Sequence, residues 1–214
     1  MSATVLPVVR PVVSVATARR LLVVTAVLLT TAGGVLTARA LYLRAKAALA
    51  AHLIARAWED TLRTGVNTPP WPWADTHPIG RLIIPRIGYN EVILEGASGR
   101  NMAFGPAHMM DSEPLGAPGN MVVAGHRTSW FLPLKDVAVD DDIQLQWRNA
   151  ATGALTQRVY RVTEIHVIDP ADLTYITPAT TEYLTLMTCY PFGHQPHSPR
   201  RYVVRAVPVP EGRG

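Results

Sequence analysis

The chain of 214 residues is long enough for one sizeable domain and a short appendage, and 48% of its residues are hydrophobic against 17% charged. Its net charge of +4 is unevenly distributed: residues 1–63 hold 8 Lys/Arg and 2 Asp/Glu, a balance of +6, whereas residues 64–214 hold 12 and 14, a balance of −2. The positive charge therefore belongs to the N-terminal part and not to a basic nucleic-acid-binding surface, which argues against a nucleic-acid partner. The single cysteine excludes an intramolecular disulfide.

An uncharged apolar segment follows a short basic N-terminal tail, residues 1–20. This segment, LLVVTAVLLTTAGGVLTA, covers residues 21–38. A helix of this length spans about 27 Å, close to the roughly 30 Å of a bilayer's hydrocarbon core. A cleaved signal peptide is the alternative, because Ala38, Arg39 and Ala40 place small residues at a cleavage-like spacing. We favour an uncleaved transmembrane segment that makes the protein a single-pass protein of the cell (inner) membrane.

Two segments lead from this anchor to the rest of the chain. Residues 64–78, TGVNTPPWPWADTHP, contain prolines that cannot continue a helix, and they predict an extended linker in which Trp71 and Trp73 pack against the protein. Residues 39–63 are rich in Ala, Leu and Arg and predict a helical stalk. Its loosely apolar face comprises Leu41, Leu49, Leu53, Ala57 and Leu62.

Short segments rich in β-branched residues occupy residues 79–210. Turns containing Gly, Pro and Asp separate them, as in antiparallel β proteins. The segments are RLIIP to EVIL (81–94), MVVAG (121–125), DIQLQW (142–147), VYRVTEIHVI (159–168), YLTLMTC (183–189) and YVVRAVPV (202–209). This pattern predicts one all-β domain, either a barrel or a sandwich.

The only thiol, Cys189, ends one of these strands in the stretch TLMTCYPF. A catalytic cysteine needs a base or a positive charge nearby, because the thiolate is the nucleophile. His126 is the best candidate for the base, since it follows a strand and Gly125, and a barrel could bring two strand ends together. A third group comes from the start of the next strand, where either Arg200 or Arg201 could donate to an anionic oxygen. Their spacing does not choose between these two arginines.

The remaining polar clusters are given structural interpretations. His194 and His197 lie close to Cys189 in the sequence, but no CxxC or HExxH motif accompanies them, so neither a metal site nor a cofactor is predicted. The run from Asp140 to Asp142 is interpreted as a solvated turn in preference to a calcium loop. Three further histidines are interpreted as loop or surface residues: His77, His108 and His166.

Three blocks of sequence resemble a known family. TLMTCYPF, with Arg201 twelve residues after the cysteine and followed by YVV, resembles the Cys–Arg block of sortases. GNMVVAGHRTSWFLPLKDV resembles their histidine block, and IGRLIIPRIG resembles their first barrel strand. The blocks occur in the expected order and cover residues 79–207. PWPWAD and EGASGRNMAFGPAHM further resemble the class GN sortases of Gram-negative bacteria.

The resemblance implies an eight-stranded sortase-type β-barrel with His126, Cys189 and Arg201 as the catalytic group, and so selects Arg201 over Arg200. It implies a cysteine transpeptidase that cleaves an LPxTG-like sorting signal near the C-terminus of an exported protein. A thioester forms and is resolved by an unidentified amine, with the barrel on the outer or periplasmic side of the membrane. The alternatives are another cysteine acyl transferase or peptidase, and a membrane-anchored all-β binding module with an inert cysteine.

Overall fold

A computed structural model describes residues 14–193 and 199–210, which belong to two compact units divided between Ala48 and Leu49. One helix, α1 (Val15–Thr64), includes both the predicted anchor and the predicted stalk. Two adjacent glycines at 33–34 do not interrupt it. Within α1 an 18-residue window has a mean hydropathy of 2.1 and no buried residue, so among the described residues this is the one helix long and apolar enough to cross a membrane.

The last turns of α1 belong to the second unit and bury one face. Ile54, Ala57, Trp58 and Thr61 are the buried residues of the helix, and their spacing of three and four places them on one side. Leu49, which the sequence assigned to the apolar face, is 57% exposed. The packed face is therefore displaced from the predicted one, and bulky Trp58, 2% exposed, lies within it.

The linker after α1 is only partly packed. Trp71 meets Phe104 edge-on with ring centroids 5.1 Å apart, as the sequence predicted for this tryptophan. Trp73, however, is 82% exposed, so the prediction that it packs was wrong. The chain turns here, since the amide of Ala74 donates to the carbonyl of Trp71 at 3.0 Å, so the two tryptophans do not share one face of an extended segment.

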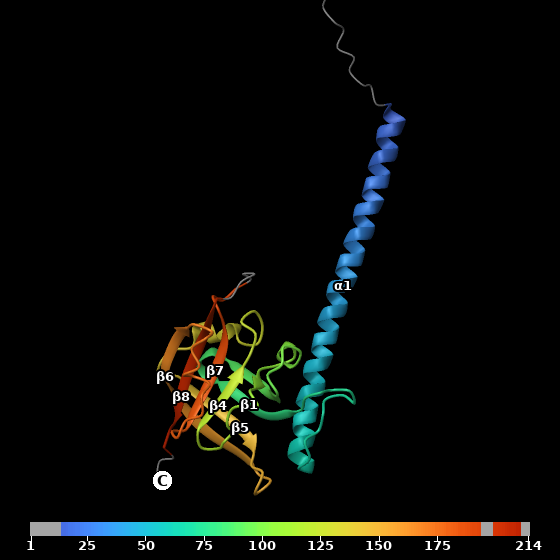
Figure 1. The fold of residues 1–214 in the computed structure, drawn as a ribbon. Helices are drawn as coiled ribbons and strands as arrows, with labels where there is room; N and C mark the ends of the chain where they lie inside the picture. Colours follow the sequence, from blue (N-terminus) through green and yellow to red (C-terminus); the bar gives the residue numbers. More distant parts are fainter. Residues whose placement is uncertain (1–13, 194–198, 211–214) are drawn as a thin grey trace, which may run out of the picture. The chain divides into compact units, whose positions relative to one another are not determined.

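Eight strands close into a barrel, which confirms the predicted fold. Their order around the barrel is β1-β2-β3-β4-β7-β8-β6-β5. Figure 1 labels β1 and β4 to β8. The strands are β1 (Pro78–Ile84), β2 (Tyr89–Glu95), β3 (Ala107–His108), β4 (Asn120–Ala124), β5 (Asp142–Arg148), β6 (Leu155–Ile168), β7 (Tyr183–Tyr190) and β8 (Arg200–Pro208). Three short 3-10 helices lie between strands: η1 (Pro85–Ile87), η2 (Asn101–Ala103) and η3 (Leu132–Asp136).

Side-chain alternation fills the barrel interior. Every second residue of β1 and of β5 is buried, because successive side chains of a strand point to opposite faces. The inward positions are mostly aliphatic, and many of them are fully buried. They include Leu82, Ile84, Ile93, Met121, Val123, Ile143, Leu145, Tyr160, Val162, Leu184, Leu186, Val204 and Ala206.

The strand directions bring three distant segments to one end of the barrel. β4 and β7 are parallel neighbours, so they end together, and β8 runs antiparallel to β7 and begins there. Figure 1 shows these three strands side by side, with β4 in yellow-green and β7 and β8 in orange to red. We call this end of the barrel the Cys189 end. The segment after β4, the last residues of β7 and the first residues of β8 meet there.

Candidate active site

Cys189 and Arg201 face each other across the antiparallel pair of β7 and β8. Residues directly opposite in such a pair have their side chains on the same face. The guanidinium Nη1 of Arg201 lies 3.7 Å from Sγ of the half-buried Cys189 and also donates to the backbone carbonyl of Arg200 at 3.4 Å. Arg200 is opposite Tyr190, so alternation turns its side chain to the other face. The register therefore brings Arg201, and not Arg200, to the thiol.

The parallel pair of β4 and β7 brings His126 to the same place. The last pair in its register is Ala124 with Met187, and His126 and Cys189 each lie two residues beyond it. The same spacing from the last pair places the backbone of His126 beside the strand that carries Cys189. The amide of Gly125 still donates to the carbonyl of Met187 at 3.2 Å, so the two chains remain neighbours as they leave the sheet.

A tight turn follows His126 and fixes its backbone. The carbonyl of His126 accepts hydrogen bonds from the amides of Ser129, at 3.2 Å, and Phe131, at 3.1 Å. This turn folds the fully buried Phe131 ring over Gly125, where a Cβ atom would lie 2.8 Å from the ring's Cγ. Glycine is needed before His126 because the ring occupies the space of a side chain.

An aromatic cluster supports the segment that follows Cys189. Phe192 meets Tyr202 edge-on with centroids 4.9 Å apart and Tyr190 with centroids 6.1 Å apart. Tyr202 is the residue after Arg201, and Tyr190 is the residue after Cys189. Alternation therefore directs the aromatic cluster and the Cys189–Arg201 contact to opposite faces of the two strands.

The position of His108 contradicts its interpretation as a loop or surface residue. It is on β3 and is 3% exposed, with Nδ1 at 3.6 Å from a carboxylate oxygen of Glu95 and Nε2 at 2.9 Å from the carbonyl of Glu113. Burial lowers the pKa of His108, but the Glu95 carboxylate and the Glu113 carbonyl outweigh it, so the pKa of His108 is raised. Strand β3 was missed because it is only two residues long, which made this histidine look like part of a loop.

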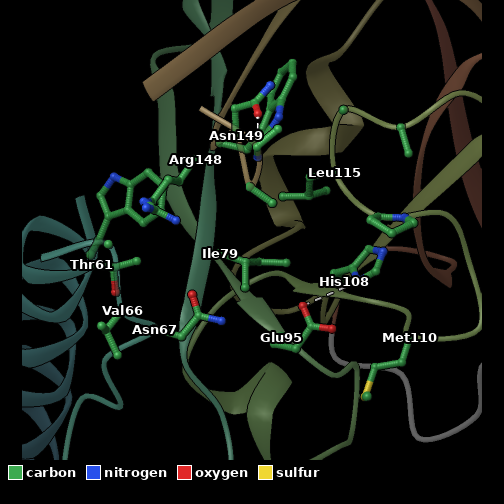
Figure 2. A pocket seen from close by; sticks show the side chains of 18 of the residues that line it. Thr61, Val66, Asn67, Ile79, Glu95, His108, Met110, Leu115, Arg148 and Asn149 are labelled. Atoms are coloured by element: carbon green, nitrogen blue, oxygen red, sulfur yellow. Dashed lines mark hydrogen bonds and ion pairs between the residues drawn. The ribbon is translucent and has the colours of Figure 1, made fainter. Parts of the chain in front are cut away.

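His108 and Glu95 border a cavity of about 900 Å³ between the strands and the end of α1. Figure 2 shows the ion pair on one side of this cavity and Arg148, from the end of β5, on the other. Glu95 and Arg148 end β2 and β5 on the side away from Cys189, whereas His108 pairs with Val123 within the sheet. Cys189, His126 and Arg201 are not among the residues that line the cavity. The cavity is therefore separate from the Cys189–Arg201 contact.

The other polar candidates make structural contacts. His166 lies on β6 with its side chain 48% exposed and Nε2 3.4 Å from a carboxylate oxygen of Glu164. In the acidic turn, Asp141 pairs with Arg86, and Asp142 accepts a hydrogen bond from Arg161 at 2.6 Å. His194 and His197 lie outside the described residues. Within the residues that the structure describes, no group of three or more His, Cys, Asp or Glu side chains is arranged to hold a metal ion.

Comparison with known proteins identifies the family. The family model "Sortase domain" matches residues 82–209, more than half of the chain. The chain belongs to the sortase family. The family match does not identify the class GN subtype that the sequence predicted, so that subtype stays a prediction.

Two curated sortases are similar in sequence to the barrel. Sortase D of Bacillus subtilis is 30% identical over 126 residues, which cover 58% of this chain and 61% of that protein. Sortase A of Listeria monocytogenes is 27% identical over 115 residues, which cover 52% and 49%. The chain thus spans between about half and three fifths of the length of these relatives.

Solved sortase structures share the barrel. A lid mutant of sortase A from Corynebacterium diphtheriae is 27% identical, with a TM-score of 0.56, over 66% of this chain and 75% of that one. Sortase C1 of Streptococcus agalactiae, solved in complex with MTSET, is 27% identical with a TM-score of 0.54, over 64% and 72%. The fold alone is also shared with a Clostridium perfringens sortase D5, at 19% identity and a TM-score of 0.59.

The sequence did not predict the contacts of two residues beside this sortase's predicted site. The Thr188 hydroxyl donates to the carbonyl of Gly125 at 2.7 Å, and Arg127 Nη1 donates to the carbonyl of Pro191 at 2.6 Å. Both bonds join the β4 segment to the β7 segment. Their only signal in the sequence is adjacency, since each residue is next to Cys189 or His126, and adjacency does not predict a bond across two strands.

Proposed function

We propose that this protein is a membrane-anchored sortase that cleaves a sorting signal of an exported protein and transfers that protein to an amine. The observation that carries the proposal is the contact between Cys189 Sγ and Arg201 Nη1, 3.7 Å apart, on a sortase barrel whose β4 leads into His126. A nucleophile, a proton-transfer group and an oxyanion donor are the three parts that acyl transfer requires.

In the first half-reaction the thiolate of Cys189 attacks the carbonyl carbon of the scissile peptide bond. The carbonyl oxygen becomes anionic, and the guanidinium of Arg201 donates to it. The C–N bond then breaks while the imidazolium of His126 gives its proton to the departing amine. The products are a thioester on Cys189, neutral His126 and a free amine fragment.

The second half-reaction reverses these roles. An acceptor amine attacks the thioester carbonyl, and His126 takes the proton that this nitrogen loses. The C–S bond breaks, and Cys189 leaves as a thiolate. One peptide bond has been exchanged for another, with no oxidant, metal or cofactor required by this balance.

The apolar part of α1 supports anchoring in the cell (inner) membrane. Residues 21–38 carry no charge, and Leu21, Leu29 and Val35 are all more than half exposed, as expected of side chains that face lipid. We infer a single span with the barrel on the outer or periplasmic side, where exported proteins emerge. The substrate would carry an LPxTG-like signal near its C-terminus.

Intact mass spectrometry of the full chain in detergent tests the proposal. The protein is incubated with a peptide containing an LPxTG-like motif, with and without triglycine. We expect an adduct equal in mass to the peptide minus its leaving fragment, and triglycine should convert it to a ligated peptide. Cys189→Ala should abolish both products, and product formed by that variant would refute the covalent step.

A matched pair of variants tests the role of Arg201. Removal of one oxyanion donor costs about 10²–10³-fold in kcat, so Arg201→Ala should fall by that factor. Arg200→Ala, next in sequence but on the other face, should stay within about threefold of the kcat of the unsubstituted enzyme.

Two outcomes would favour the alternative functions. Hydrolysis that triglycine does not suppress would indicate a peptidase. A Cys189 that neither acylates nor reacts with iodoacetamide would indicate a binding module.

A further inference from the structure

The paired backbone of β4 and β7 stops short of the residues assigned to catalysis. Its last register pair is Ala124 with Met187, and His126 and Cys189 both lie beyond it. Pro191 follows Cys189 by two residues and has no backbone N–H, so it cannot donate to a continued ladder. Other contacts must hold the two segments together at this position.

Two side-chain bonds fall on either side of the His126–Cys189 position. Before it, the buried hydroxyl of Thr188 donates to the carbonyl of Gly125 at 2.7 Å. After it, Nη1 of Arg127 donates to the carbonyl of Pro191 at 2.6 Å. Each bond runs from one segment to the other. Together they replace the backbone ladder over the residues where it is missing.

Arg127 is suited to this task by charge and by direction. Hydrogen bonds from a charged donor are shorter and about twice as strong as neutral ones, and 2.6 Å is short for an N–H···O bond. Arg127 lies in the turn that follows His126, and its side chain reaches across to the backbone that follows Cys189.

We propose that Arg127 is a positioning residue for acyl transfer, holding the segment that carries His126 against the segment that carries Cys189. This inference rests on the proposed function. A misplacement of about 1 Å between reacting groups can cost about 10²-fold in rate. Loss of the Arg127–Pro191 bond should therefore slow proton transfer while leaving substrate binding nearly unchanged.

Kinetics of the full chain in detergent provide the first test. Arg127→Gln should lower kcat for triglycine ligation about 10–100-fold with KM changed less than threefold, and Arg127→Lys, which keeps a charged donor, should recover part of the loss. Thr188→Val should lower kcat in the same way. Thr185→Val is the matched control: this buried threonine of β7 also bonds to β4, donating to Asn120 Oδ1 at 2.7 Å, but it lies away from the Cys189 end. It should lower stability and leave kcat within about threefold.

A cross-linking measurement needs no enzyme activity. Adjacent strands place Cα atoms about 5 Å apart, within the 4.4–6.8 Å that a disulfide spans. A His126→Cys variant should therefore form a disulfide between positions 126 and 189 under mild oxidation. Adding Arg127→Gln should slow that reaction at least tenfold, whereas adding Thr185→Val should not.

The two measurements separate failure of this inference from failure of the proposed function. If the chain never acylates but Arg127→Gln still slows cross-linking, the positioning role of Arg127 stands and the proposed acyl transfer is rejected. Normal ligation and normal cross-linking in Arg127→Gln would overturn the positioning role and keep the transferase. Equal losses in Arg127→Gln and Thr185→Val would also overturn it, because they would show a general loss of structure.

Discussion

Replacing Gly125 with alanine should destabilise the barrel through a single steric contact. The new Cβ would lie 2.8 Å from Cγ and 2.9 Å from Cδ2 of Phe131, whereas carbon atoms in contact are normally about 3.5–4.0 Å apart. The ring would have to move by about 1 Å, and Phe131 is fully buried, so no solvent-filled space receives it. Gly125 is not among the glycines with positive φ, so backbone strain does not add to the clash.

The expected magnitude follows from core overpacking, which costs about 1–3 kcal/mol. For a chain of this size 1 kcal/mol corresponds to a change in Tm of about 2–4 °C. Gly125→Ala should therefore lower the Tm of the barrel by about 2–12 °C, measured by near-ultraviolet circular dichroism. Gly99→Ala is the control, because a Cβ there meets no atom within 4 Å, and its Tm should change by less than about 2 °C.

A double-mutant cycle isolates the clash. Phe131→Leu removes the ring and should be destabilising alone, but it should relieve part of the cost of Gly125→Ala. We expect a coupling of about 0.5–3 kcal/mol, in the range measured for residues in contact. If the two substitutions were additive, or if Gly125→Ala left the Tm unchanged, the contact with Phe131 would not be the reason for glycine before His126.

Three further predictions concern stability. Because the pKa of His108 is raised, its protonation stabilises the folded state below pH about 6.5, and this stabilisation is lost as the pH rises through the pKa of the folded state. The Tm difference between the unsubstituted protein and His108→Gln should therefore be larger at pH 6 than at pH 9. A difference that does not depend on pH would refute this linkage. Glu182→Ala should lower the free energy of unfolding, measured by urea denaturation, by about 1–3 kcal/mol, because the buried Tyr160 hydroxyl donates to Glu182 at 2.6 Å and would lose its acceptor. Double substitution with Tyr160→Phe should restore part of the loss. Trp58→Ala, at a 2% exposed position of α1, should cost about 3–5 kcal/mol in the barrel's thermal transition, whereas Tyr42→Ala, 66% exposed, should leave that transition in place.

The sequence predicted the barrel well where the strands are long and apolar. The sequence predicted β6 and β7 because each is a segment of strand-forming residues longer than a loop would contain. Strand β3 has two residues and no pattern, so its buried His108 was mistaken for a surface residue. The Gly-Gly pair in the apolar segment did not break α1, because a penalty of about 1 kcal/mol per glycine is small against a helix of 50 residues.

The candidate site was predictable as a set of residues but not as a geometry. Strand alternation shows that Arg200 and Arg201 point to opposite faces, yet it does not show which of them faces Cys189. That choice depends on the register between β7 and β8, which is set by packing across two strands and cannot be read from either alone. The bonds from Thr188 and Arg127 depend on the register of β4 and β7 in the same way, and for this reason they were not foreseen.

The parallel pairing of β4 and β7 also bears on when the protein becomes reactive. Gly125 and Thr188 are separated by 63 positions, and contacts of such high sequence separation form slowly because a long loop must close first. Arg201 joins only after β8 has added to β7. Before these contacts form, Cys189 has neither the segment that carries His126 nor Arg201 beside it. Under the proposed function, completion of the barrel is therefore the step that assembles the residues around the thiol.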